Sequence, residues 1–312
     1  MDRIQCHQSE QTGGDQGDDE RGDEDEERDQ EEEESKQPGR KRKTKRQRDK
    51  DSQCSNEQTV DQCEIRLGLL NTRSMTKKAP RISELITQNN LDVFLATETW
   101  LKHATADGVL SKASPQRFSF HSQVRAGTRG GGVSNQFSDV MRGKQIQFDS
   151  LIITTFEFVV TDLQHDDWNQ PVVIINLYHP PGYNQQRFRT FLNEFQSLLD
   201  EVRKNYSSFI VAGDFNIHVN KDKRSYTDEF DSLLLVNDLT QHVKEPTHKA
   251  GNTLDLVITS NVEVSGLVVQ DEKKVVKSDH YTVYFNAKPK DTTDKTEENK
   301  NEEQKPFRQT EE

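Results

Sequence analysis

The most constraining stretch of the chain is a short apolar run that ends at a carboxylate. Residues 209–212 (F-I-V-A) are apolar without alternation, which is typical of a strand buried on both faces. Gly213 ends the run, and Asp214 and Asn216 follow it. Open sheets place ligands beyond the carboxyl ends of their strands, so Asp214 and Asn216 are candidate catalytic residues. An Asx turn that caps the strand is the competing interpretation.

The charge of the chain is concentrated in its two ends. The 312 residues carry a formal net charge of −12. Residues 1–62 hold 12 Lys+Arg and 20 Asp+Glu, and residues 286–312 hold 6 and 8, which leaves 24 and 26 for residues 63–285. This distribution predicts two disordered charged tails, 1–62 and 286–312, around one α/β domain at 63–285.

The N-terminal tail contains an acidic block and then a basic block. The basic block, Arg40–Arg48, has two interpretations: a solvated tail, or a patch for a nuclear-import receptor or nucleic acid. No apolar stretch indicates a membrane span or a secretory signal. Cys6, Cys54 and Cys63 lack metal-ligand spacing. We therefore expect a protein of a reducing compartment, nuclear or else cytoplasmic, with no membrane partner and no secretion.

Further apolar runs end or begin at polar side chains in the same way. Asn71 follows a first strand, Glu98 follows a second, Tyr178 ends a third, Asp255 lies in a fourth, and Asp279 and His280 precede the last. Each residue has an ordinary interpretation as a turn cap, loop acid or interface hydroxyl. Together they are the side-chain types that bind a hard divalent cation and hydrolyse a phosphodiester.

Other segments have patterns typical of single elements. Pro80 opens a helix that ends near Asn89, and residues 184–205 and 227–237 form two more helices. Residues 151–163 and 172–178 indicate an antiparallel pair of strands, and residues 101–123 are irregular and loop-like. The glycines of R-G-G-G-V at 129–133 indicate a hairpin connection or a phosphate-binding loop.

Seven motifs in order carry a resemblance to a known family: N-T-R-S, T-E-T-W, R-G-G-G-V, Y-H-P-P-G, G-D-F-N, T-L-D-L-V and S-D-H. This series resembles the endonuclease/exonuclease/phosphatase superfamily, which includes DNase I. It is most similar to the apurinic-type endonuclease domain of non-LTR (LINE-type) retrotransposons. The resemblance implies a DNase I-like, four-layer α/β sandwich, with two mixed β-sheets flanked by helices.

The resemblance also implies a metal site. Glu98 would be the main Mg²⁺ ligand with Asn71 beside it, and Mn²⁺ would be an alternative ion. Asp279 would hold a second or migrating metal.

The implied catalytic residues are five. Asp214 would orient and deprotonate the attacking water, and Asn216 would hold that water or the scissile phosphate. His280 would donate to a phosphate oxygen, Asp255 would fix the tautomer of His280, and Tyr178 would donate its hydroxyl to the phosphate.

Two departures from the family pattern stand out. Arg73 occupies the position at which the abasic-site repair enzymes carry a second acid, which disfavours a repair role. Residues 134–143 are polar where relatives have an apolar strand, so we expect a frayed edge strand there. No reverse transcriptase sequence follows Phe285, so we expect an isolated endonuclease domain, either a fragment of a larger element or a stand-alone derivative.

The sequence therefore predicts a Mg²⁺-dependent DNA endonuclease that nicks one strand and leaves a 3′-hydroxyl and a 5′-phosphate. Two alternatives remain open. One is a phosphatase of the same fold, for which the sequence does not reveal a sufficiently basic pocket. The other is a non-catalytic module that binds nucleic acid or protein.

Overall fold

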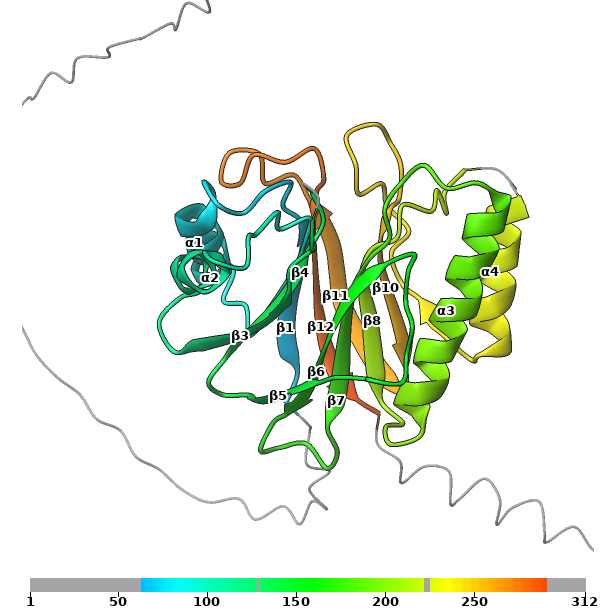
Figure 1. Ribbon diagram of the computed structural model, residues 1–312. Coiled ribbons are helices and arrows are strands. Elements are labelled where there is room, and N and C mark those ends of the chain that lie inside the picture. Colours follow the sequence, from blue (N-terminus) through cyan, green and yellow to red (C-terminus); the bar gives the residue numbers. More distant parts are fainter. Residues whose placement is uncertain (1–62, 128–129, 222–224, 291–312) are drawn as a thin grey trace, which may run out of the picture. The chain divides into compact units, whose positions relative to one another are not determined.

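The computed structural model describes residues 63–127, 130–221 and 225–290 (Figure 1). Two six-stranded sheets pack face to face, with one pair of helices on the outside of each sheet. This is the four-layer α/β sandwich with mixed sheets that the sequence predicted. The expectations for the disordered N-terminal tail and for Arg40–Arg48 lie outside the described residues, as does most of the C-terminal tail.

The first sheet has the strand order β11-β12-β1-β2-β4-β3. Its strands are β1 Ile65–Asn71, β2 Val93–Thr97, β3 Phe118–Gln123, β4 Val133–Ser138, β11 Val262–Gln270 and β12 Thr282–Pro289. The second sheet has the order β5-β6-β7-β8-β10-β9. Its strands are β5 Arg142–Ile146, β6 Glu157–Gln164, β7 Val172–Tyr178, β8 Phe209–Asp214, β9 Thr240–Gln241 and β10 Asp255–Ser260.

Strand direction brings polar residues to one edge of the sandwich. β1 pairs with β2 in parallel, and β7 pairs with β8 in parallel. β12 is antiparallel to β1, and β10 is antiparallel to β8. β10 and β12 therefore begin where β1, β2, β7 and β8 end. We call this end of the sandwich, which is formed by strand termini and not by an outermost strand, the site edge.

The helices pack their apolar faces against the outer faces of the sheets. α1 (Ala79–Gln88) and α2 (Ala106–Ala113) cover the first sheet, and α3 (Gln185–Arg203) and α4 (Ser225–Val236) cover the second. On α3, the spacing of the buried Phe188, Phe191 and Phe195 forms one apolar stripe. Asn184 caps α3 by accepting from the Arg187 backbone N–H at 2.9 Å. No helix among the described residues combines the length and hydrophobicity needed to cross a membrane.

Three predictions about local structure were wrong. Residues 101–123 are not simply a loop, because they contain α2 and β3. The polar stretch from residue 134 is not a frayed edge, because β4 lies between β2 and β3 and is buried. Its side chains find partners inside the protein: Gln136 donates to the Ala113 carbonyl at 3.0 Å and Asn135 donates to Thr161 at 3.1 Å. The last strand also extends to Pro289, beyond the predicted end at Phe285.

Candidate active site

All eight candidate residues lie at the site edge. Asn71, Tyr178 and Asp214 are the last residues of β1, β7 and β8, and Asp255 is the first residue of β10. Asp214 is directly opposite both Tyr178 and Asp255 in the second sheet. The remaining four residues lie just outside strands: Glu98 after β2, Asn216 after β8, and Asp279 and His280 before β12.

Asn71 joins the carboxylates of the two sheets. Its Nδ2 donates to Glu98 Oε1 at 3.1 Å and to Asp214 Oδ2 at 2.8 Å. Its Oδ1 accepts from the Arg73 backbone N–H at 3.1 Å. In this arrangement Asn71 holds the two carboxylates together through its N–H groups, instead of offering its oxygen to a cation.

Two aromatic side chains fix the Glu98 carboxylate. The Tyr178 hydroxyl donates to Oε1 at 3.1 Å, and Trp100 Nε1 donates to Oε2 at 3.0 Å. Glu98 and Trp100 have φ angles of +48° and +52°, in the left-handed region that such residues rarely adopt. Burial first, and then the charge of Glu98, raises the pKa of Tyr178 far above its ordinary value, so Tyr178 stays a hydrogen-bond donor.

Asp214 and Asn216 form the Asx turn that was the competing interpretation. Asp214 Oδ1 accepts from the Asn216 backbone N–H at 3.0 Å. The same turn aims the Asn216 side chain at the site, because its Nδ2 donates to Asp214 Oδ2 at 3.2 Å and to the His179 carbonyl at 2.8 Å. The turn and a catalytic arrangement are therefore compatible.

Asp255 and His280 form a buried pair. His280 Nδ1 lies 2.8 Å from Asp255 Oδ2, and the Asp255 side chain is fully buried. Burial alone lowers the pKa of His280, but the negative charges of Asp255 and Asp214 outweigh it and raise that pKa to about 9. His280 is thus held as a cation, with Nε2 as its remaining donor.

The surroundings of Asp214 favour the protonated form of its carboxyl group. It is buried beside Asp255, and burial followed by the charge of Asp255 raises the pKa of Asp214 to about 8. The carboxyl is therefore close to the range in which a general base works at neutral pH.

The Asp279 carboxylate lies among basic side chains. Its Oδ2 binds Arg73 and lies 3.4 Å from His248 Nε2 and 3.8 Å from Lys249 Nζ. The His248 ring also contacts the His280 ring at 4.8 Å between centroids. Trp100 and His248 were not predicted as site residues, and Arg73 was considered only as a departure from the repair enzymes. Trp100 and Arg73 nevertheless lie within the T-E-T-W and N-T-R-S motifs.

The donor set fits a hard divalent cation. Glu98 supplies carboxylate oxygens at a partly exposed position, and Mg²⁺ needs only one or two carboxylates from a protein. The Asp255 Oδ1 and Asp279 Oδ1 atoms are buried and have no hydrogen-bond partner among the described residues. His248, Asp279 and His280 form a second group that could hold a metal, as do Asp214, Asp255 and His280.

A basic pocket adjoins the site on the side of the first sheet. The pocket has a volume of about 610 Å³ and is lined by Trp100, Ser278, Asp279 and five cationic side chains, namely Arg73, Lys78, Lys249, Lys273 and Lys277. Burial first, and then the charge of Arg73, lowers the pKa of Lys78. Such a grouping of positive charge is favourable for an anionic ligand, and the sequence did not reveal it.

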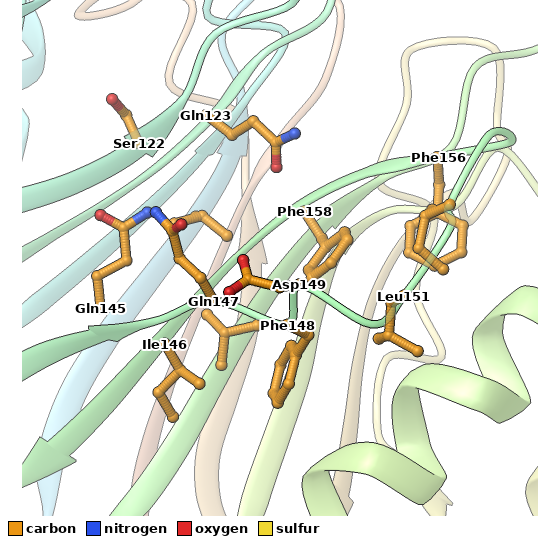
Figure 2. A pocket seen from close by; sticks show the side chains of 13 residues that line it. Ser122, Gln123, Gln145, Ile146, Gln147, Phe148, Asp149, Leu151, Phe156 and Phe158 are labelled. Atoms are coloured by element: carbon orange, nitrogen blue, oxygen red, sulfur yellow. The ribbon is translucent and has the colours of Figure 1, made fainter.

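A second pocket, of about 400 Å³, has different chemistry. Figure 2 shows Gln123, Gln145, Phe148 and Phe158 around it, together with Asp149. It lies between β3 and the segment that joins β5 to β6, and none of the eight candidate residues lines it. We therefore treat it as separate from the candidate active site.

Comparisons with known proteins bear on the family and the fold. Residues 172–284 match the family model described as "Endonuclease-reverse transcriptase". A comparison with curated proteins found no match.

Solved structures share the fold at low sequence identity. The endonuclease domain of TRAS1, a telomere-specific non-LTR retrotransposon, is 15% identical with a TM-score of 0.56, over 73% of this chain and 100% of that one. The AP endonuclease LMAP from Leishmania major is 15% identical with a TM-score of 0.56, over 72% and 87%. The human Nocturnin catalytic domain is 16% identical with a TM-score of 0.57, over 72% and 94%.

The two-sheet sandwich is thus the fold of these solved structures, and residues 172–284 within it match the endonuclease-reverse transcriptase family model.

Proposed function

We propose that the domain is a divalent-metal-dependent phosphodiesterase that nicks one strand of DNA. The observation that carries this proposal is the hydrogen-bonded chain Glu98–Asn71–Asp214, which connects a candidate metal ligand on one sheet to a candidate base on the other. The products would be a 3′-hydroxyl and a 5′-phosphate. This is the chemistry we expected from the resemblance to retrotransposon endonucleases.

Each residue has a defined part in the reaction. In its ionised form Asp214 accepts a proton from the attacking water, and its raised pKa makes it a stronger base than an ordinary aspartate. Asn216 orients that water or the scissile phosphate. His280, protonated against Asp255, donates from Nε2 to a non-bridging phosphate oxygen and stabilises the charge that builds in the transition state. Tyr178 donates its hydroxyl proton to Glu98 in the free protein and would redirect it to the phosphate when substrate is bound.

Glu98 would hold the Mg²⁺ or Mn²⁺ ion, and Asn71 would keep its carboxylate in place. When bound, the cation polarises the phosphate and stabilises the leaving oxygen. Asp279 would contribute to a second cation position only after it exchanges its contact with Arg73.

The basic pocket supports a substrate with several phosphates. Its five cationic side chains face one carboxylate within the pocket, that of Asp279. A nucleic acid strand that crosses the site edge would neutralise these charges with its backbone phosphates. Nucleic acid is therefore the substrate class that this side of the site favours.

The test is nicking of supercoiled plasmid in Mg²⁺ or Mn²⁺. We expect the wild-type protein to relax the plasmid, and Asp214→Ala and His280→Ala to lower the rate by roughly 10²–10³-fold or more. Asp166→Ala is the matched control, because this carboxylate is exposed and lies at the opposite edge of the second sheet. Unchanged nicking by Asp214→Ala and His280→Ala would show that the site is wrongly assigned.

A phosphatase is the second candidate, because the basic pocket would also attract the phosphate group of a phosphomonoester. Release of inorganic phosphate from a phosphomonoester, without plasmid nicking, would support this activity. If the wild-type protein neither nicks DNA nor releases phosphate with either metal, a non-catalytic binding module becomes the preferred assignment.

A further inference from the structure

The glycine loop before β4 surrounds an arginine. Gly131 and Gly132 have φ angles of +65° and +83°, which favour glycine. A Cβ atom on Gly131 would collide with the Arg125 guanidinium, and one on Gly132 would collide with the Thr99 hydroxyl. The loop joins the antiparallel strands β3 and β4, which confirms the hairpin connection considered from the sequence. Its glycines also allow a close approach to Arg125 and to the segment that follows β2.

Arg125 forms a largely buried ion pair with Glu157. The two side chains are 22% and 16% exposed, and Arg125 Nε donates to Glu157 Oε1. The other Glu157 oxygen accepts from the Gly132 backbone N–H. Glu157 is also the cross-strand neighbour of Tyr178 between β6 and β7. The pair thus connects the glycine loop to the strand that carries Tyr178.

One connection runs from this pair to Glu98 through Tyr178. The Arg125 guanidinium lies over the Tyr178 ring, with Cζ 5.5 Å from the ring centroid. The Tyr178 hydroxyl in turn donates to Glu98 Oε1 at 3.1 Å. Arg125 therefore restricts the ring that holds one oxygen of the carboxylate.

A second connection runs through the backbone of the glycine loop. The Gly132 carbonyl accepts from the Thr99 N–H at 3.1 Å, and the Gly131 carbonyl accepts from the Trp100 N–H at 2.9 Å. Trp100 Nε1 then donates to Glu98 Oε2 at 3.0 Å. The left-handed φ angles of Glu98 and Trp100 cost free energy, and these loop hydrogen bonds hold the segment in that conformation.

We propose that Arg125 and Glu157 are a positioning pair for the Glu98 carboxylate. Both aromatic side chains that bond to this carboxylate are supported by the pair, one through ring packing and one through the glycine loop. The inference rests on the proposed role of Glu98 as the metal ligand, and it assigns the preorganisation of that ligand to two residues outside the eight candidate site residues.

The test measures metal affinity without relying on catalysis. The chain has two tryptophans, so a Trp168→Phe background leaves Trp100 as the reporter beside Glu98. Mn²⁺ is titrated while Trp100 fluorescence is followed, and thermal unfolding confirms that each variant is folded. We expect Arg125→Ala and Glu157→Gln each to raise the Kd for Mn²⁺ by about 10-fold or more. Arg125→Lys should recover part of the loss.

Coupling between the two positions provides a sharper criterion. The double variant should bind Mn²⁺ no more weakly than the worse single variant, because each change removes the same pair. Arg142→Gln is the matched control, because it breaks an exposed pair with Asp166 at the other end of β6, and it should leave the Kd unchanged. If Arg125→Ala fails to fold, Glu157→Gln and Arg125→Lys carry the test.

The results separate this inference from the proposed function. Wild-type Mn²⁺ affinity and wild-type Trp100 emission in folded Arg125→Ala or Glu157→Gln would overturn the positioning role, as would an equal loss in Arg142→Gln. Weakened Mn²⁺ binding in these variants, together with no nicking by the wild-type protein, would uphold the positioning role and reject the nuclease.

Discussion

Asp214 and Asp255 are opposite each other across β8 and β10, and both carboxyl groups are buried. The protonated His280 lies against Asp255 and offsets the buried negative charge of that carboxylate. The pKa of His280 is raised to about 9 and that of Asp214 to about 8. The residues that would perform the chemistry are therefore also the ones that make the folded protein sensitive to pH.

The metal-free protein should lose stability as the pH rises from about 6.5 to about 9. His280 keeps a proton in the folded state up to about pH 9, whereas its ordinary pKa is 6.5, so its contribution is full below 6.5 and is lost through 9. Asp214 retains a proton up to about pH 8 against an ordinary 3.8, so its effect has the same sign. In EDTA, we expect the Tm to fall by roughly 5–10 °C over this window.

His280→Gln is the control for that measurement, because it removes one of the two titrating groups. Its Tm should fall less than that of the wild-type protein between pH 6.5 and pH 9. A wild-type Tm that is constant or rising over the window would contradict the electrostatic account of the site.

At the scale of elements, one amide on β7 connects the two sheets. The fully buried Asn176 donates from Nδ2 to the Ala96 carbonyl of β2 at 3.1 Å and to the Ser134 carbonyl of β4 at 3.0 Å. The site depends on the relative position of the sheets, because Glu98 follows β2 whereas Tyr178 ends β7. Asn176 is therefore a structural link beneath the site.

Asn176→Ala should lower the free energy of unfolding by about 2 kcal/mol or more, since it leaves two buried carbonyl groups without this donor. Urea denaturation measures the change. Ser232→Ala removes an exposed side-chain hydrogen bond on α4 and should shift stability by less than about 0.5 kcal/mol. Equal effects of the two substitutions would mean that Asn176 does not link the sheets.

The elements that the sequence predicted well are those with a strong apolar pattern. The buried runs that became β2, β7 and β8, and the aromatic stripe of α3, fix their own structure by burial. The prediction for β4 was wrong because its Asn135 and Gln136 are polar, and their partners on other elements are invisible in a local pattern. The edge strand β11 was not predicted, because about half of its residues are exposed and its apolar pattern is weak.

The candidate site was predictable to a similar degree. Its eight residues lie at the ends of recognisable strands, and parallel pairing of β1 with β2 and of β7 with β8 gathers the residues of each sheet. Packing of the two sheets face to face, which no local pattern predicts, then brings the two groups together. The basic pocket was not predictable, because Arg73 and Lys277 are about two hundred positions apart and meet only through the pairing of β1 with β12. The ion pair of Arg125 and Glu157 was not predictable either, because its two residues come from separate segments of the chain.

At the scale of the whole molecule, positive charge lies on one flank of the site. The basic pocket has five cationic side chains, whereas the pocket near β3 has amides, phenylalanines and one carboxylate. A nucleic acid backbone should therefore pass over the basic pocket. This charge distribution gives the near-neutral domain a local surface for a polyanion.

Lys273→Gln combined with Lys277→Gln should weaken DNA binding and reduce its salt dependence. Every phosphate that the protein no longer neutralises lowers the slope of log K against log salt by about 0.9, so we expect a decrease of roughly 1–2. Binding is measured in EDTA to prevent cleavage. Lys204→Gln, at the exposed end of α3, should leave the slope unchanged.

Removal of residues 1–62 should lower the slope of log K against log salt further if Arg40–Arg48 contacts DNA, and an unchanged slope would exclude that contact.

If the proposed function is correct, Glu98, Asp214 and His280 share one metal-bound phosphate. The most direct measurement is a crystal structure with Mn²⁺ and a non-hydrolysable oligonucleotide, in which anomalous scattering locates the ion. We predict an ion bound to the Glu98 carboxylate, with one phosphate within hydrogen-bond reach of His280 and next to Asp214. An ion held only by His248, Asp279 and His280, or a phosphate bound away from Asp214, would contradict the account.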